Sequence, residues 1–152
     1  MKITSLLVAG AWVGLMLATP ALAADHQVQM LNKDAEGRAM HFEPAFLKIA
    51  PGDTVTFVPT DKGHNAESIA TLTPEGAEPW KGKINEEISV TFDTEGFYAY
   101  KCLPHFGMGM VGLIQVGDAP AALDQAAVEK LPQRPEDRLT ELLAEAAAPT
   151  AQ

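Results

Sequence analysis

The sequence has little cysteine and little positive charge. Its 152 residues include a single cysteine, Cys102, so no disulfide can form within the chain. Lys and Arg together number 11 against 20 Asp and Glu, which gives a formal net charge of −9. A chain this acidic is a poor candidate for nucleic-acid binding, and it lacks the basic amphipathic stretch of a membrane-surface helix.

Long apolar runs are also missing, apart from one near the start. Ile3–Leu17 is mostly apolar, but it is shorter than the roughly 20 residues that span a bilayer. A lysine precedes this run, and Ala21-Leu22-Ala23 after it has the small-x-small pattern of a signal-peptidase site. We therefore predict a signal peptide over residues 1–24, cleaved after Ala23 or Ala24. The mature protein is expected to be exported to a periplasm-type compartment, with no membrane span.

What remains after the leader is one domain, and residues 25–117 have the pattern of an all-β sandwich or barrel. Short runs rich in β-branched and aromatic residues are separated by Gly, Pro, Asp and Asn. Three of these runs alternate with period two, and Thr71–Asn85 has the composition of a long irregular connection. The expected strands are Val28–Leu31, Ala45–Ile49, Asp53–Val58, Ile88–Phe92, Phe97–Lys101 and Val111–Val116.

The composition changes after Asp118 to Ala, Leu, Glu and Gln. Apolar residues fall at helical spacing over Leu123–Leu131 and again over Leu139–Ala146. Pro135 is well placed near the start of the second run, since proline is tolerated in a first turn. We predict two short helices that pack on the sandwich, as an extension of the same domain over residues 118–148.

The one cysteine stands in a segment rich in possible metal ligands, Cys102-Leu-Pro-His105-Phe-Gly-Met-Gly-Met110. Taken singly, such residues are more often packing residues than ligands. Here Cys102 ends one predicted strand and Met110 begins the next, so one tight loop can direct three ligands at a single point. His64 can approach from a neighbouring loop. Two imidazoles, a thiolate and a weak axial thioether form the ligand set of a blue-copper electron-transfer site.

Several alternatives to this interpretation have to be weighed. Met108 competes with Met110 for the axial position, although Met110 directly precedes the predicted strand. A copper enzyme needs a second copper site, and the sequence has only four histidines, of which His26 and His41 have no partner spacing. His26 is expected to be solvated. A copper chaperone or buffer is the second candidate function, but its Met and His ligands usually cluster on an exposed surface. Four protein ligands leave no open position for a substrate, which predicts a carrier and not an enzyme.

The chain resembles the pseudoazurin family of cupredoxins over nearly all of its mature length. The Cys-x₂-His-x₄-Met loop is shared with plastocyanins, so the Lys-Gly-His-Asn context and the helical tail favour pseudoazurins. The resemblance implies an eight-stranded Greek-key β-sandwich that holds one copper ion through His64, Cys102, His105 and Met110. The segments that carry it are Met30-Leu-Asn-Lys33, Phe42-Glu-Pro-Ala45, Pro51–Phe57, Asp61-Lys-Gly-His-Asn65, Pro74–Glu78, the Cys102–Met110 loop and the tail.

Other residues are expected to support the site or its partners. Asn65 is a candidate to tie neighbouring loops together and orient the ligands, and Met40 resembles a family position near the loop histidine. We expect transient docking through an apolar patch and a ring of lysines, by a monomer that shuttles single electrons. The resemblance implies a copper-containing nitrite reductase as partner, or a c-type cytochrome or dehydrogenase. The proposed docking residues are Pro104, Phe106, Met108, Lys62, Lys81, Lys83 and Lys101.

Overall fold

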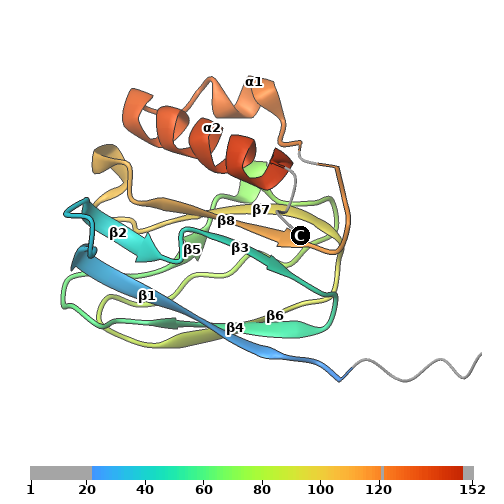
Figure 1. Cartoon of the computed structure of the whole chain (residues 1–152), viewed down its shortest axis with the longest axis horizontal. Helices are drawn as coiled ribbons and strands as arrows, with labels where there is room; N and C mark the ends of the chain where they lie inside the picture. Colours follow the sequence, from blue (N-terminus) through green and yellow to red (C-terminus); the bar gives the residue numbers. More distant parts are fainter. Residues whose placement is uncertain (1–21, 121, 149–152) are drawn as a thin grey trace, which may run out of the picture.

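Two four-stranded β-sheets pack face to face in the computed structural model, which describes residues 22–120 and 122–148 (Figure 1). One sheet has the order β2-β1-β4-β6, and the other has the order β3-β8-β7-β5. Both sheets are mixed, because β1 pairs with β4 and β3 pairs with β8 in parallel. The strands are β1 (Asp25–Lys33), β2 (Ala39–Glu43), β3 (Phe46–Ile49), β4 (Asp53–Val58), β5 (Glu67–Ser68), β6 (Ile88–Phe92), β7 (Gly96–Lys101) and β8 (Val111–Val116).

The six strands predicted from the sequence are confirmed, and two more were missed. β5 has only two residues, so it is too short to show a period. β2 has no clean alternation, and Met40 within it has a positive φ of 52°. The two missed strands occupy outer positions in their sheets, where fewer side chains are buried and the hydrophobic signal is weaker.

The sheet β2-β1-β4-β6 is exposed on its outer face. β4 alternates between buried and half-buried residues along its whole length. On the outer face, the hydroxyl groups of Thr54 and Thr91 are 2.9 Å apart, and those of Thr56 and Ser89 are 2.8 Å apart. These cross-strand pairs satisfy polar side chains at the surface, as expected for an antiparallel pair with one solvated face.

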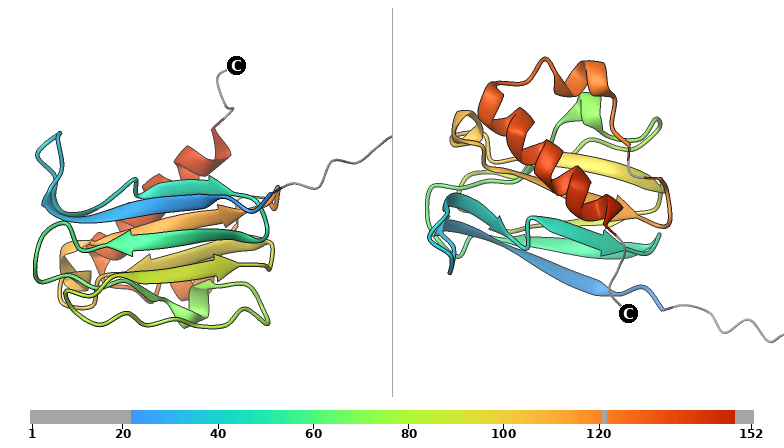
Figure 2. Two further views of the ribbon diagram at one scale, coloured as in Figure 1. Left: turned by 90° about the horizontal axis from the view of Figure 1, so that it is seen from below. Right: turned by 45° about the horizontal axis from the view of Figure 1, so that its top comes forward.

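The sheet β3-β8-β7-β5 is covered on both faces. Tyr98 and Tyr100 of β7 belong to the core between the sheets, whereas Phe97 and Ala99 belong to a second core beneath the helices. Leu142 lies in that second core and is fully buried. Figure 2 shows the long helix lying across the outer face of this sheet. β8 is buried at all six positions, as a doubly covered strand should be.

The two predicted C-terminal helices are confirmed, with different bounds. The Asp124 side chain caps the start of α1 (Gln125–Val128) by accepting hydrogen bonds from two backbone N–H groups. With this start, α1 is shorter than the predicted helix over Leu123–Leu131. α2 (Gln133–Ala147) begins two residues before Pro135, which lies in its first turn. Within residues 22–120 and 122–148, no helix is long and apolar enough to cross a membrane.

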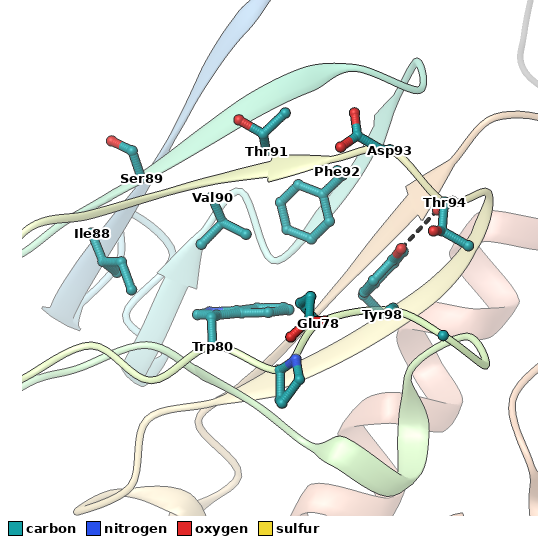
Figure 3. Close-up of a pocket in the computed structure, with 13 residues that line it drawn as sticks. Glu78, Trp80, Ile88, Ser89, Val90, Thr91, Phe92, Asp93, Thr94 and Tyr98 are labelled. Carbon is teal, nitrogen blue, oxygen red and sulfur yellow. Dashed lines mark hydrogen bonds between the residues drawn. The ribbon is translucent and has the colours of Figure 1, made fainter.

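Aromatic rings fill the core beside an open pocket of about 450 Å³. Trp80 stacks on Phe57 with ring centroids 6.1 Å apart and meets the edge of Phe92 at 5.4 Å. Figure 3 shows the indole of Trp80 facing Phe92 across the pocket, with the Tyr98 hydroxyl donating to the Thr94 carbonyl at 2.7 Å. None of the residues that line this pocket is a predicted copper ligand, so the metal centre lies elsewhere.

Candidate metal centre

The loop between β7 and β8 carries three of the four predicted ligands. Cys102 directly follows β7, and Met110 directly precedes β8. The Cys102 N–H donates to the Met110 carbonyl at 3.0 Å, and the Met110 N–H donates to the His105 carbonyl at 3.3 Å. Gly109 has a φ of 89°, a left-handed conformation that favours glycine. The loop is therefore held by a strand at each end and by its own backbone within.

The fourth predicted ligand, His64, comes from the connection between β4 and β5. The Gly63 N–H donates to the Asn85 Oδ1 at 2.6 Å, and the Asn85 N–H donates to the His64 carbonyl at 2.9 Å. At the outer end of the ring, His64 Nε2 donates to the Asn32 Oδ1 at 3.0 Å. This hydrogen bond places the proton on Nε2, so the lone pair on Nδ1 is available to a metal near Cys102.

Three donor atoms converge on one point. Cys102 Sγ lies 3.6 Å from His64 Nδ1 and 3.4 Å from His105 Nδ1, and the two Nδ1 atoms are 3.1 Å apart. A first-row metal with bonds of about 2.0 Å to imidazole nitrogen and about 2.3 Å to thiolate sulfur holds its ligand atoms roughly 3–4 Å apart. The donors therefore fit a single ion. With Met110 beside them, the four residues are arranged like a type 1 copper site.

The centre is buried except on the side of His105. His64 and Cys102 are fully buried and Met110 is 1% exposed, whereas His105 is half-buried. Around His105 the surface is apolar, and Leu103 and Met108 are 47% and 46% exposed. Pro104 is also exposed. A single ligand thus connects the buried centre with the surface of the molecule.

The electrostatics of the donor residues favour a bound cation. Burial lowers the pKa of His64, so its imidazole stays neutral and keeps a lone pair for a metal. Burial also raises the pKa of the Cys102 thiol, which disfavours a thiolate without a nearby positive charge. A metal ion held by these residues would supply that charge, and the thiol would lose its proton on binding.

Asn65 connects the His64 loop to the Cys102 loop. Its Oδ1 accepts from the Leu103 N–H at 2.7 Å, and its Nδ2 donates to the Glu67 Oε2 and to the Gly82 carbonyl, each at 3.1 Å. The residue is only 2% exposed. These contacts are of the kind expected for a residue that orients ligands, and its effect on the copper stays a prediction.

A buried carboxylate lies beneath part of the predicted lysine ring. Glu67 is 3.5 Å from Lys101 Nζ and 3.9 Å from Lys81 Nζ, and its side chain is only 9% exposed. Lys62 and Lys83 are exposed at the surface. Because Glu67 offsets part of the charge of two lysines, the ring is less uniformly basic than the positions of its lysines in the sequence suggested.

The two methionines that are predicted to lie near the site without binding the metal line the same groove. Met40 and Met108 line one groove of about 230 Å³ that also includes Gly109 and Arg134 of α2. Met108 is exposed, whereas Met40 is half-buried against the core between the sheets. The groove borders the ligand loop, and the proposed roles of both residues remain predictions.

The two histidines without an expected role both lie beside carboxylates. The expectation that His26 is solvated is wrong: its side chain is 27% exposed, and its Nε2 lies 2.8 Å from the Asp53 Oδ2. His41 is buried, with its Nε2 at 3.5 Å from Asp34 and 3.7 Å from Glu43. No local pattern indicates the contact of His26 with Asp53 or of His41 with Asp34, because these partners lie on different segments of the chain.

Sequence reasoning also missed three residues that hold the ligand loops. Asn32 fixes the His64 ring, Asn85 fixes the backbone around His64, and Glu67 binds Asn65. Asn32 occurs in the segment that resembles pseudoazurins, but that resemblance did not indicate its contact. Only the fold brings these side chains to the ligands.

A sandwich with this donor set defines the class of small blue copper proteins, and comparison with known proteins agrees. The family model described as copper binding proteins of the plastocyanin/azurin family matches residues 28–117. The pseudoazurin of Paracoccus pantotrophus is 53% identical over 139 residues, which cover 91% of this chain and 95% of that protein. A putative pseudoazurin of Rhizobium leguminosarum is 56% identical, with coverage of 87% and 91%.

Solved structures give the same result. The crystal structure of pseudoazurin from Methylobacterium extorquens AM1 superimposes with a TM-score of 0.71 at 42% identity, covering 80% of this chain and 98% of that one. Pseudoazurin from Hyphomicrobium denitrificans gives a TM-score of 0.70 at 43% identity, covering 80% and 97%. The chain belongs to the pseudoazurin family, and it is a blue copper electron-transfer protein.

Proposed function

We propose that this protein is an exported shuttle that carries single electrons between redox proteins, with His64, Cys102, His105 and Met110 as the ligands of one copper ion. The convergence of one thiolate and two imidazoles within 3.6 Å of one another carries this proposal. When bound, copper supplies a one-electron couple. The chain contributes a closed and preorganised set of donors, and four protein ligands leave no position for a substrate.

Electrons are proposed to enter and leave at His105, which is the half-buried ligand among three buried ones. Leu103, Pro104 and Met108 form an exposed apolar patch around it, with the half-buried Phe106 beside them. An apolar patch excludes water when a partner docks and separates readily afterwards if it is small. Transient contact of this kind suits a carrier that must leave each partner.

Acidic redox proteins are the proposed partners, with a copper-containing nitrite reductase first and a c-type cytochrome or a dehydrogenase as the other candidates. Lys62, Lys81, Lys83 and Lys101 are proposed to steer the encounter. Lys101 Nζ also lies 4.9 Å from the centroid of the Phe106 ring, which joins the basic and apolar parts of the surface. Because Glu67 offsets Lys81 and Lys101, and the Glu86 carboxylate lies 3.5 Å from Lys83 Nζ, we expect Lys62 to contribute most to steering.

Export to the periplasm is proposed from the leader. Most of residues 1–24 lies outside the described part of the chain, so this proposal is supported by the sequence of the leader: a short apolar run and a small-x-small site. Leu22, Ala23 and Ala24 are exposed, which leaves the predicted cleavage site accessible to a peptidase.

The test measures electron transfer from the reduced protein to a copper-containing nitrite reductase by stopped flow. Charge reversal of both Lys62 and Lys83 to Glu should slow transfer at low salt and leave the visible spectrum unchanged. Lys48→Glu is the matched control, because Lys48 lies on β3 and pairs with Asp118 at 2.8 Å, away from the ligand loop. Screening shortens to about 8 Å at physiological ionic strength, so the difference should shrink as salt rises.

Equal rates for the double variant and the wild type at low salt would reject the lysine steering. A copper chaperone or buffer is the competing function, and voltammetry separates the two. A carrier gives a reversible couple and a strong colour with Cu(II), whereas a colourless protein that holds only exchangeable Cu(I) would overturn the proposed function.

A further inference from the structure

The beginning of β1 carries an unusual pair of contacts. The backbone nitrogen of Ala24 lies 2.8 Å from the Asp53 Oδ1, and His26 Nε2 lies 2.8 Å from the Asp53 Oδ2. One carboxylate therefore holds both a backbone nitrogen and an imidazole from the first residues of the strand. Asp53 is itself fixed, because it is 5% exposed and also accepts the Ala50 N–H at 3.0 Å.

The chemistry of this segment changes if the leader is removed after Ala23. This step rests on the proposed export, because only that cleavage converts the Ala24 nitrogen into a free amine. The new amino terminus then reads Ala24-Asp25-His26, with histidine in third position. A terminal amine, the next two backbone nitrogens and a third-position imidazole can close chelate rings around one ion. The result is a square-planar set of nitrogens, the arrangement preferred by Cu(II) and Ni(II).

We propose that the mature amino terminus, Ala24-Asp25-His26, is a second metal site that binds Cu(II) or Ni(II). The imidazole ligates through Nδ1, because that nitrogen closes the chelate ring with the His26 backbone nitrogen. His26 Nε2 is then free to keep its hydrogen bond to Asp53. A carboxylate that accepts from the other ring nitrogen is the usual support of a metal-bound histidine. On binding, the amine and the two amide nitrogens release their protons to solvent.

The strand can release these residues without disturbing the sandwich. The first half of β1 pairs only with β4, because the pairing with β2 begins at Gln29. Ala24 and Asp25 are exposed. Winding the terminus around an ion breaks the contact between the Ala24 nitrogen and Asp53. It also loosens the end of one ladder, where the Thr54 N–H donates to the Ala24 carbonyl at 2.9 Å. Terminal residues of this kind open at little cost in free energy.

The charges around the site favour a cation. His26 and Asp53 line a hollow of about 370 Å³ together with Lys48, Glu95 and Asp118. Lys48 is paired with Asp118 at 2.8 Å, so the remaining negative charge of the hollow comes from Glu95 and from Asp53, the carboxylate that contacts the chelating segment. Asp25 adds another carboxylate within the chelating segment itself.

The proposed site is independent of the type 1 centre. β1 runs from the amino terminus to the end of the sandwich that holds the ligand loop (Figure 1). His26 and Asn32 are separated by six residues of strand, which is about 20 Å at about 3.3 Å per residue. Its donors are all nitrogen, so the site stabilises Cu(II) and has no part in the exchange of electrons.

The experiment uses the mature chain prepared in two ways. One preparation is exported from the full-length gene, and intact-mass analysis gives its first residue. The other is released from an amino-terminal fusion so that it begins at Ala24 by design. Both are loaded with copper at the type 1 centre and titrated with Cu(II). We expect one further bound equivalent with a tetragonal, nitrogen-only electron paramagnetic resonance signal, and no change in the strong visible band.

Two variants and a control make the result specific. His26→Gln should lose the second equivalent, whereas the matched control His41→Gln should keep it. A chain with one extra residue before Ala24 retains His26 but moves it to fourth position, and it should also lose the second equivalent. If the chain that begins at Ala24 binds no second ion, or if His26→Gln still binds it, the inference is overturned while the blue copper function stands. If the exported chain begins elsewhere, the natural protein lacks this site and the proposed cleavage position is wrong.

Discussion

The two sheets of the sandwich differ in what covers them. The sheet β2-β1-β4-β6 has a solvated outer face with paired hydroxyl groups, whereas the sheet β3-β8-β7-β5 is buried on both faces because α2 packs on it. The doubly covered sheet carries Cys102 and Met110 at the ends of its central strands. Close-packed interiors resist small shifts, so Cys102 and Met110 are attached to the more rigid of the two sheets.

The helical extension also contacts the ligand loop directly. A Cβ atom added at Gly109 would lie 3.3 Å from the Arg134 carbonyl oxygen of α2. The start of the helix therefore backs the loop that carries His105 and Met110. The helical tail therefore covers one face of the sheet and also supports the loop that carries two of the proposed metal ligands.

The largest effect is expected at Cys102, at the end of the doubly covered sheet. Cys102→Ser should abolish the intense visible band of the Cu(II) protein, because that band is charge transfer from a copper-bound sulfur and a hydroxyl oxygen cannot reproduce it. Ser89→Ala, on the solvated face of the other sheet, is the control and should retain the full band. An absorption spectrum of each copper-loaded variant checks this, and a strongly blue serine variant would contradict the copper assignment.

A large loss of stability is expected beneath α2. Leu142 is fully buried, so Leu142→Ala should lower the free energy of unfolding by about 2–5 kcal/mol. Thr91→Ala, on the outer face of β6, should cost about 0.5 kcal/mol because it removes only an exposed hydroxyl pair. Urea unfolding of the copper-free proteins gives both values. Similar losses at the two sites would remove the distinction between the covered and the solvated sheet.

A smaller, pH-dependent effect is expected at the seam between β2 and α2. Burial, with the charges of Arg38 and Arg138, lowers the pKa of His41 to about 4. The unfolded chain takes up this proton near its usual value of about 6.5. The stabilisation is therefore complete above pH about 6.5, and it is lost as the pH falls toward about 4. We expect a loss of roughly 1–3 kcal/mol across this window.

His41→Leu should remove this component of the pH dependence, because leucine does not titrate. Urea midpoints of both proteins at neutral pH and at pH about 4.5, within the titration window of His41, measure the difference. Thr91→Ala serves as the control and should keep the slope of the wild type. A leucine variant with the wild-type slope would show that another group is responsible.

The smallest effect is expected from replacing the axial ligand, which should change the reduction potential and leave the fold intact. Met110→Gln should keep the fold and a coloured copper centre but lower the reduction potential, because an oxygen donor favours Cu(II) over Cu(I) more than a thioether does. Met108→Leu keeps the apolar bulk on the exposed side of the loop and should shift the potential much less. Voltammetry of the two variants decides the matter, and a larger shift at Met108 would reverse the axial assignment.

The sequence predicted the strands and the donor set well because both have local signals. Alternation marks Asp53–Val58, and one loop holds three of the ligands within nine residues. Apart from Asn65, which the sequence singled out as a candidate, the support around the ligands had no such signal. Asn32 lies 32 residues from His64, and Asn85 lies 22 residues from the Gly63 N–H that its side chain accepts. Residues this far apart meet only through the fold, so no local pattern in the chain predicts their contacts.

The parallel pairing of β3 with β8 affects how the protein folds. It joins Phe46 to Leu113, so the sheet that carries Cys102 cannot close until most of the chain is available. His64 and Cys102 are themselves 38 residues apart, and an unfolded chain brings them together only against the entropy of loop closure. Folding is expected to be slow for a topology with so many distant pairings. Copper that binds the folded chain in preference to the unfolded one shifts the equilibrium toward the folded state by mass action.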